Sequence, residues 1–329
     1  MKTLDVYGIG NPLIDLLVHV PESFLNEQSL EKNRMYLVDR IRQKEILNKL
    51  ATAQYKVTTA PGGSCANTMI GICQLGGSAG FTGKTGDDEH GEEYQKQLTL
   101  AGVENFVAYA NGMTGSSLVL VNPDGSRTMN TCLGMCQDLG ENDIRKNVIK
   151  NAKILYFTGY LWDTDSQKAA VKHALETAKE HDTQIAMSLS DAFCVNRHTA
   201  DFKSLLKEYV NIVFCNQEEA FALAETNHTQ TAMDYLAENV QTVVLTLGGK
   251  GALISNNKVQ SYVDSQTVKV IDTTGAGDAF AAGFLYGLTH GQSINECGQI
   301  ATMMAAEVIS QLGPRCTTDM KSKMKQLFS

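Results

Sequence analysis

Strand-like and helical segments alternate along the second half of the chain, and this alternation constrains the fold more than any other feature. Apolar runs rich in β-branched and aromatic residues occur at 153–159, 183–190, 211–216 and 242–248. Between the first two runs, apolar residues recur at helical spacing with charges on the opposite face, and Asp165 is a candidate cap. Strands that alternate with helices predict a doubly wound parallel sheet covered by helices.

The first 135 residues follow a less regular pattern. Segment 4–10 is typical of a strand, and extended segments follow it, two of them joined by a turn at 122–125. Strands that leave a parallel sheet and meet elsewhere can form a small lid over a site. With no repeat or linker to divide the chain, we expect a single domain, 1–329, with a lid from about 12–40 and 104–132.

Composition and charge exclude several classes of protein. Of the 329 residues, 43% are hydrophobic and 19% are charged, which is typical of a globular enzyme and not of a disordered chain. The formal net charge is -8 and the basic residues are scattered, so the basic stripe of a nucleic-acid-binding protein is missing. No run approaches the roughly 20 apolar residues that span a bilayer. We expect a cytoplasmic protein, without membrane or nucleic-acid partners, that binds small molecules.

Several glycine-rich segments resemble nucleotide-binding motifs without matching them. In "GIGNPL", Leu13 stands where the dinucleotide fingerprint has its third glycine, and in "GAGDAF" Phe280 stands there. No GxxxxGK[ST] segment is present, which excludes the P-loop. A nucleotide would therefore have to bind in another mode.

The segment "IDTTGAGDAF", at 271–280, combines a flexible loop, a carboxylate and the start of a helix. After an expected strand at 267–272, the N–H groups of 275–277 can form an anion-binding nest, to which the helix adds the positive end of its dipole. Asp278 could then accept a proton while the nest stabilises a phosphoryl group. The alternative is that Asp278 is only a stabilising first-turn charge, worth about 0.3 to 1 kcal/mol.

Two motifs together resemble the ribokinase-like (PfkB) family of carbohydrate and nucleoside kinases. They are "DTTGAGDAF" at 272–280 and "PGGSCANTM" at 61–69, which occur in the family's order and at a wide separation. The resemblance covers nearly the whole chain. It implies an α/β fold of three layers, α/β/α, whose doubly wound and mostly parallel sheet carries a small β-strand lid. It also implies phosphoryl transfer from ATP, with Mg²⁺, to a hydroxyl group.

The family pattern gives catalytic roles to residues around the nest and on the lid. The resemblance implies that Asp278 is the catalytic base, and that Gly275, Ala276 and Gly277 form the anion hole. It implies that Arg127, on the lid, reaches the transferring phosphate. Judged alone, an arginine after a turn is usually a solvated charge.

The acceptor end of the site is expected at the N-terminal motifs. The resemblance implies that Asn11, Asp15, Gly62, Gly63 and Asn67 hold a ribose. A carboxylate or amide pairs with adjacent hydroxyls, and a glycine lets the sugar lie against the backbone. Without the neighbouring motif, Asp15 is a strand-end carboxylate and Asn67 is the cap of the helix that begins there.

The donor end is expected after the later strands of the sheet. The resemblance implies that Asn216 and Glu219 organise Mg²⁺, mainly through water, and a helix cap with a first-turn glutamate is a structural role that can coexist with it. Thr246, Gly248 and Gly251 resemble the turn that binds ATP, although such turns also occur without ligands.

A monovalent cation, K⁺, is also implied by the resemblance. The matching positions, which act mostly through backbone oxygens, are Asp272, Thr274, Gly313 and Cys316.

Within the family, four further segments resemble the adenosine kinase branch. They are "GIGNPLIDL", "GSRTMNTCLG", "NQEEA" and "LGPRCT". This branch implies that the 5′-hydroxyl of adenosine is the acceptor, with AMP and ADP as products, and that the base lies against Leu37, Leu133, Tyr160 and Trp162. Polar lid residues at 130–131 keep a sugar such as ribose, fructose or 2-keto-3-deoxygluconate open as the acceptor.

Two alternatives remain at the level of the whole chain. The fold could serve a non-catalytic nucleoside-binding module, although such a module would not need the base Asp278. The chain could be a monomer, or its exposed lid strands could pair in a homodimer.

Overall fold

The alternating segments build one large sheet. In the residues that the computed structural model describes, 2–32 and 34–328, this sheet has nine strands. They are β1 (Leu4–Ile9), β5 (Ala79–Thr82), β7 (Glu104–Asn105), β11 (Ala152–Thr158), β12 (Gln184–Ser188), β13 (Ile212–Asn216), β14 (Thr242–Thr246), β15 (Ala252–Asn256) and β16 (Val259–Val263). Their order is β16-β15-β14-β13-β12-β11-β1-β5-β7, and only β15 and β16 run antiparallel to their neighbours. This confirms the predicted doubly wound, mostly parallel sheet.

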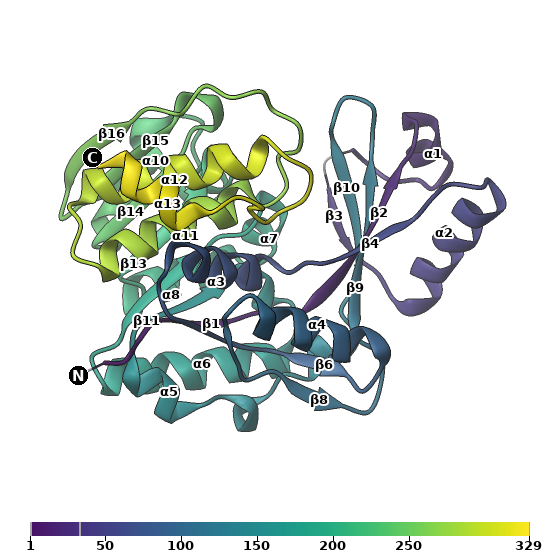
Figure 1. Ribbon diagram of the computed structural model, residues 1–329, viewed down its shortest axis with the longest axis horizontal. Helices are drawn as coiled ribbons and strands as arrows, with labels where there is room; N and C mark the ends of the chain where they lie inside the picture. The colour runs from purple at the N-terminus through teal and green to yellow at the C-terminus, as the bar shows by residue number, and fades with distance from the viewer. Residues whose placement is uncertain (1, 33, 329) are drawn as a thin grey trace.

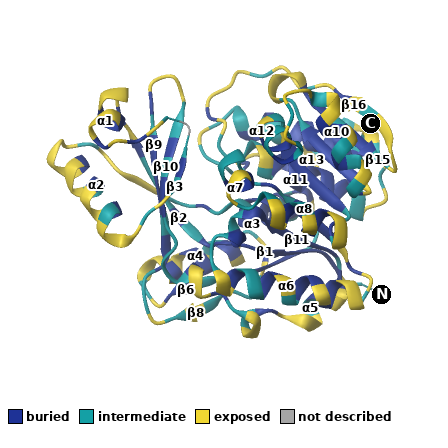
Figure 2. Ribbon diagram, turned by 180° about the vertical axis from the view of Figure 1, so that it is seen from behind, coloured by how far each residue is buried: buried dark blue, intermediate teal, exposed yellow. Residues whose placement is uncertain are grey.

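Helices cover both faces of the sheet because side chains alternate along each strand. In β11, Ile154 and Tyr156 join one core, and Leu155 and Phe157 join the other. The first face carries α3 (Ser64–Leu75), α4 (Glu89–Leu100), α11 (Ala276–Thr289), α12 (Ile294–Ile309) and α13 (Met320–Leu327). The second carries α5 (Lys146–Asn151), α6 (Asp165–Glu180), α7 (Ala192–Arg197), α8 (Thr199–Glu208), α9 (Gln217–Ala224) and α10 (Thr229–Asn239). The buried strands between them form the middle of three layers (Figure 2).

A second, smaller sheet stands apart from these layers and forms the lid (Figure 1). Its strands are β2 (Leu13–His19), β3 (Met35–Leu37), β4 (Thr58–Pro61), β9 (Gly115–Val121) and β10 (Arg127–Cys132), in the order β3-β10-β9-β2-β4. The expected turn at 122–125 joins β9 and β10. Helices α1 (Glu22–Glu27) and α2 (Arg40–Thr52) pack on its outer face through a separate apolar cluster that includes Phe24, Ile46 and Leu118.

The lid differs from its expected bounds at two places. The segment before Gly115 belongs to other sheets, since β7 pairs with β5, and β8 (Ala108–Ala110) pairs with β6 (Lys84–Gly86). Strand β4, outside the expected range, adds an edge next to β2. That the whole chain is one domain stays a prediction.

Two local predictions are wrong. Thr164, and not Asp165, caps α6, because its hydroxyl accepts from the N–H of Gln167 while Asp165 is already helical. The expected strand at 267–272 is irregular chain. Its apolar residues Val270 and Ile271 are more than half exposed, because no described strand lies beside them to pair with.

Short 3₁₀ helices connect several elements. They are η1 (Gly134–Asp138), η2 (Glu141–Asp143), η3 (Gly159–Trp162) and η4 (Gly248–Lys250). No helix in the described part of the chain has both the length and the apolar character needed to cross a bilayer.

Candidate active site

A cavity of about 410 Å³ lies between the inner face of the lid and the main sheet. Lid strands β2, β3, β9 and β10 form one wall. The carboxyl ends of β11 to β14 and the first turns of α3 and α11 form the other. Ligands of open α/β sheets collect at this edge, so the sheet topology itself selects this cavity as the candidate site.

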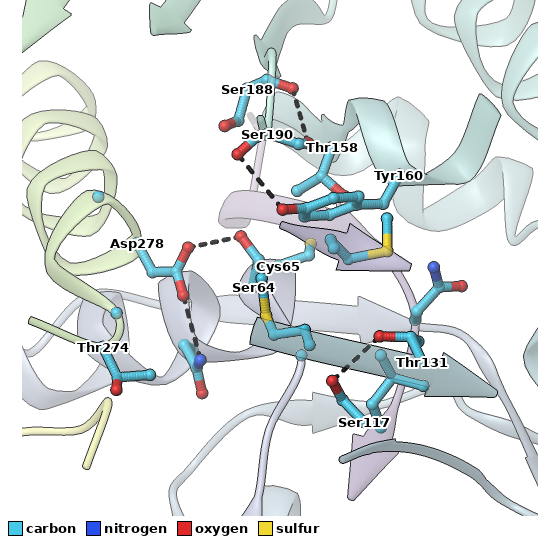
Figure 3. Close-up of a pocket in the computed structure, with 18 of the residues that line it drawn as sticks. Ser64, Cys65, Ser117, Thr131, Thr158, Tyr160, Ser188, Ser190, Thr274 and Asp278 are labelled. Atoms are coloured by element: carbon cyan, nitrogen blue, oxygen red, sulfur yellow. Dashed lines mark hydrogen bonds between the residues drawn. The ribbon is translucent and has the colours of Figure 1, made fainter. Parts of the chain in front are cut away.

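Two helix N-termini meet at Asp278. The hydroxyl of Ser64, in the first turn of α3, donates to Oδ1 of Asp278 at 2.5 Å (Figure 3). Nδ2 of Asn67 donates to Oδ2 of Asp278 at 3.1 Å. The helices approach closely because Gly71 faces Ala282, where an added Cβ would stand 2.7 Å from the alanine methyl. The carboxylate is therefore held by both its oxygens at the floor of the cavity.

Both helices begin at a glycine in the left-handed region. Gly63 has a φ of 91° and Gly275 a φ of 74°, and neither helix has a capping side chain. At Gly277, an added Cβ would meet no described heavy atom within 4 Å, so space lies open beside the first turn of α11. The N–H of Ala276 donates to the carbonyl of Thr273 at 3.3 Å, but the positive end of the helix dipole and this open space suit an anion, and the nest at 275–277 stays a prediction.

Burial dominates the electrostatics of the two carboxylates in the cavity. It raises the pKa of Asp278 above its usual value, against the hydrogen bonds from Ser64 and Asn67 and the positive charge of Arg315. Burial also raises the pKa of Asp15 to about 7, against the charges of Arg315 and Arg127. A raised pKa makes a carboxylate a stronger base, which suits Asp278 for accepting a proton.

The predicted ribose residues lie together at the hinge of the lid. Asp15 packs against the backbone of Gly62, where an added Cβ would stand 2.2 Å from Oδ2 of Asp15. Asn11, Asp15, Gly63 and Asn67 all line the cavity. The position of Gly62 behind Asp15 explains why a glycine is needed there. Asn67 does not cap α3, since that helix begins at Ser64.

Arg127 reaches across from the lid and forms an ion pair with Asp272. It lines the cavity, as does Thr274. The carboxylate of Asp272 also accepts from the N–H and hydroxyl of Thr274 and from the N–H of Gly313. With both oxygens engaged, this side chain stabilises the loop before the nest, and the expected K⁺ contact, mostly through backbone oxygens, stays a prediction.

Another of the four expected K⁺ positions, Cys316, makes hydrogen-bonding and packing contacts. Its carbonyl accepts from Nε2 of Gln74 at 2.7 Å, and burial raises the pKa of its thiol to about 12. The thiol is therefore neutral near pH 7, and a K⁺ contact through the backbone oxygen of Cys316 stays a prediction.

Asn216 and Glu219 form a reciprocal cap at the start of α9. The Asn216 side chain accepts from the N–H of Glu219, and the Glu219 carboxyl accepts from the N–H and Nδ2 of Asn216. Burial raises the pKa of Glu219 to about 8. The described residues offer no group of three or more His, Cys, Asp or Glu that could cage a metal. The cap is therefore the role that the contacts of this pair show, and its expected part in organising a hydrated Mg²⁺ stays a prediction.

The expected nucleotide turn lies partly at the cavity. Thr246, at the end of β14, lines it. Gly251 has a φ of 94°, and an added Cβ would stand 2.0 Å from the carbonyl oxygen of Val263, so this glycine is required by the turn into β15. Gly248 is exposed, with a φ of 58°. Both glycines thus have a backbone reason to be present, whether or not ATP lies over them.

The expected base-binding residues divide into two groups. Leu37, Leu133 and Tyr160 line the cavity. Trp162 instead lies in the core of the second face, 1% exposed, with Nε1 donating to Asp201. Its expected contact with the base is therefore wrong, because the turn of η3 directs its ring away from the cavity.

The two polar lid residues face opposite sides of β10. Thr131 lines the cavity and hydrogen-bonds to Ser117 at 3.0 Å (Figure 3). Asn130, one residue earlier, points to the outer face of the lid sheet, because side chains alternate along a strand. Among the described residues its amide group has no hydrogen-bond partner. Asn130 therefore says nothing against a purine in the cavity.

Sequence reasoning missed three residues of this site. Ser64 directly follows the glycine pair at a helix start, which was the available signal. Ser117 would have required the register of the lid strands. Arg315 lies in the quoted segment "LGPRCT", but its contact with Asn67, 248 positions away in the chain, cannot be read from that segment.

Comparison with known proteins agrees with this architecture. The profile of the pfkB family of carbohydrate kinases matches residues 35–320. An adenosine kinase from Sinorhizobium meliloti is 36% identical, with 99% of each chain covered and a TM-score of 0.93. A probable sugar kinase from Rhizobium etli is 35% identical, with the same coverage and a TM-score of 0.94. Adenosine kinase from Schistosoma mansoni in complex with 2-fluoroadenosine is 25% identical, covering 97% of this chain and 99% of that one, with a TM-score of 0.84.

Proposed function

Because this chain belongs to the PfkB family of carbohydrate kinases, and is a phosphotransferase that acts on a hydroxyl group, we propose that it phosphorylates adenosine. ATP is the donor, the 5′-hydroxyl is the acceptor, and AMP and ADP are the products. The observation that carries the proposal is a half-buried carboxylate, Asp278, at the first turn of α11, with an uncapped helix N-terminus beside it in the cavity under the lid.

Adenosine is favoured over a free sugar by the inner face of the lid. Asp15 pairs in register with Ser117, which pairs with Thr131, which pairs with Leu37. Strands lie about 4.8 Å apart, so this row carries polar groups about 5 and 10 Å beyond the carboxylate that would hold the ribose. A ribose at Asp15 would leave its base over Ser117 and Thr131, whereas a free sugar would leave the row unused.

Asp278 would act as the general base. Its oxygens accept from Ser64 and Asn67, and its carboxylate lies at the cavity wall. As the 5′-oxygen attacks the γ-phosphorus of ATP, its proton passes to Asp278 and the bond to the ADP oxygen breaks.

The developing negative charge would be met by the N–H groups at 275–277 and by Arg127. The guanidinium now pairs with Asp272, and both groups lie beside the nest, so a phosphate there would compete for it. Mg²⁺, when bound with ATP, would supply further neutralisation of the phosphates, with Asn216 and Glu219 contacting its water shell.

The acceptor specificity is tested by an ADP-release assay with Mg-ATP. The acceptors are adenosine, other nucleosides, ribose, fructose and 2-keto-3-deoxygluconate. We expect adenosine to have the highest kcat/KM. The matched control is 5′-deoxyadenosine, which keeps the base and ribose but lacks the acceptor hydroxyl, and which should inhibit competitively without turnover.

Other outcomes decide between the alternatives. A higher kcat/KM for a free sugar would replace adenosine with the activity named for the Rhizobium etli relative. Binding of adenosine without turnover of any acceptor would instead indicate a nucleoside-binding module.

A further inference from the structure

The chain between α12 and α13 is held by a hydrogen bond within itself and one from α3, and it packs against the start of α11. Nε2 of Gln311 donates to the carbonyl of Arg315 at 2.8 Å, and Nε2 of Gln74, from α3, donates to the carbonyl of Cys316 at 2.7 Å. Pro314 packs so closely on Gly275 that an added Cβ there would stand 2.7 Å from the proline ring. These contacts bring the side chain of Arg315 behind the floor of the cavity.

Arg315 determines which way the amide of Asn67 faces. Its Nε donates to Oδ1 of Asn67 at 3.1 Å, and Nδ2 of Asn67 donates to Asp278 at 3.1 Å. A guanidinium has donors only, so it accepts no contact from the amide NH₂ group. The oxygen of Asn67 is therefore turned toward Arg315 and the nitrogen toward Asp278. The opposite orientation would place an amide oxygen against the carboxylate.

Arg315 also carries a half-buried positive charge that acts on two carboxylates. It opposes the burial that raises the pKa of Asp15 and of Asp278. Asp15, from the lid, and Asp278, from α11, repel each other, and Arg127 from β10 acts on Asp15. Cys65 of α3 and Tyr156 of β11 also face Asp278, but burial raises the pKa of both, so they are neutral near pH 7. Tyr94 of α4, near Arg315, is neutral for the same reason.

We propose that Arg315 is a positioning residue for phosphoryl transfer, which orients Asn67 toward Asp278 and keeps the base ionised. The inference rests on the proposed function, because it assigns Arg315 a part in the reaction at the same site. Arg315 itself lies behind Asn67 and acts through it and through its charge.

The test replaces Arg315 and follows kcat, kcat/KM and melting temperature between pH 5.5 and 9. In Arg315→Met, we expect kcat to fall about 10-fold or more. The acidic limb of kcat/KM should move up by about one pH unit or more, because losing a nearby cation raises the pKa of a carboxylate that must be ionised to work. Arg315→Lys should restore the limb but not the whole of kcat, since lysine keeps the charge without the fixed planar geometry.

The control removes a contact of the chain between α12 and α13 but leaves the guanidinium of Arg315 unchanged. Gln74→Met removes the hydrogen bond to Cys316 and should lower the melting temperature while leaving the acidic limb in place. An equal shift of the limb in this control would overturn the proposal, and so would an Arg315→Met enzyme with a lower melting temperature but an unchanged pH profile. If the methionine variant does not fold, Arg315→Gln, which keeps a donor without the charge, is measured against the same expectation.

The outcome separates this inference from the proposed function. A wild-type chain that phosphorylates no acceptor contradicts the proposed function. An active wild type whose pH profile does not depend on Arg315 contradicts only the inference.

Discussion

Asp15 shows how a binding residue can cost stability. Burial raises its pKa from 3.8 to about 7, so the native state holds a proton that the unfolded chain releases near pH 4. As the pH rises from 4 to 7 the native state binds more protons than the unfolded state, and stability therefore falls over this window. The same carboxylate must be ionised to accept two hydroxyl hydrogen bonds from a ribose.

Asp15→Asn should therefore be more stable and less active than the wild type. Above pH 7 we expect a gain of up to ~4 kcal/mol in the free energy of unfolding, from about three pKa units, and the gain should vanish below pH 4. The KM for adenosine should rise about 10- to 100-fold, as for a lost hydrogen bond to a charged group. Thermal unfolding at pH 4 and pH 8, with kinetics at pH 8, measures both.

Exposed Asp264→Asn is the matched control for charge alone. A variant Asp15→Asn that is less stable than the wild type at pH 8 would contradict the account of Asp15.

At the level of single residues, the sequence predicts what lies within a motif. Asp278, Gly275 and Asn216 follow strands or loops whose local pattern has a physical meaning. Ser64 and Arg315 act on Asp278 from distant parts of the chain, and Trp162 turns into the core. Which side of a short helical turn a residue faces depends on packing that local pattern does not encode.

At the level of elements, successive side chains of one lid strand face opposite sides of the sheet and therefore have different roles. In β10, Arg127, Met129 and Thr131 line the cavity, and Thr128 lies on the outer side, where its hydroxyl donates to the carbonyl of Glu31. The cavity side carries the row that we propose to contact the base.

Ser117→Ala and Thr131→Val should therefore each raise the KM for adenosine by about 2- to 10-fold with little change in kcat. The reason is that each change removes one hydroxyl from the row. Steady-state kinetics measure the effect. The control is Thr128→Val, on the same strand as Thr131 but on the opposite face, which should lower stability and leave the KM for adenosine unchanged. Unchanged KM values in both row variants would mean that the base lies elsewhere.

Element boundaries depend on how far the pairing partners lie apart in the chain. The parallel strands β11 to β14 were predictable because each is an apolar run bounded by helical segments. Strand β4 was not, since its short run of Thr58–Pro61 is a strand only beside β2. The expected strand at 267–272 was wrong because its residues are strand-like but no described strand lies beside them to pair with.

At the level of the whole molecule, the lid determines whether the chain can pair through its sheet. Its outer face is filled by α1 and α2, and its edges are polar in β4 and three residues long in β3. We expect a monomer of 35.8 kDa, which light scattering at micromolar concentration measures directly. A mass twice as large would show that another surface pairs.

The central claim is that Asp278 accepts the proton of the acceptor hydroxyl, and its most direct test is Asp278→Asn. Single-turnover transfer from Mg-ATP to adenosine should slow by about 10²- to 10⁴-fold, because an amide is not a base. Adenosine affinity, measured by calorimetry, should stay within a few-fold, since the amide keeps the shape of the carboxylate. Transfer at the wild-type rate with unchanged affinity would contradict the account.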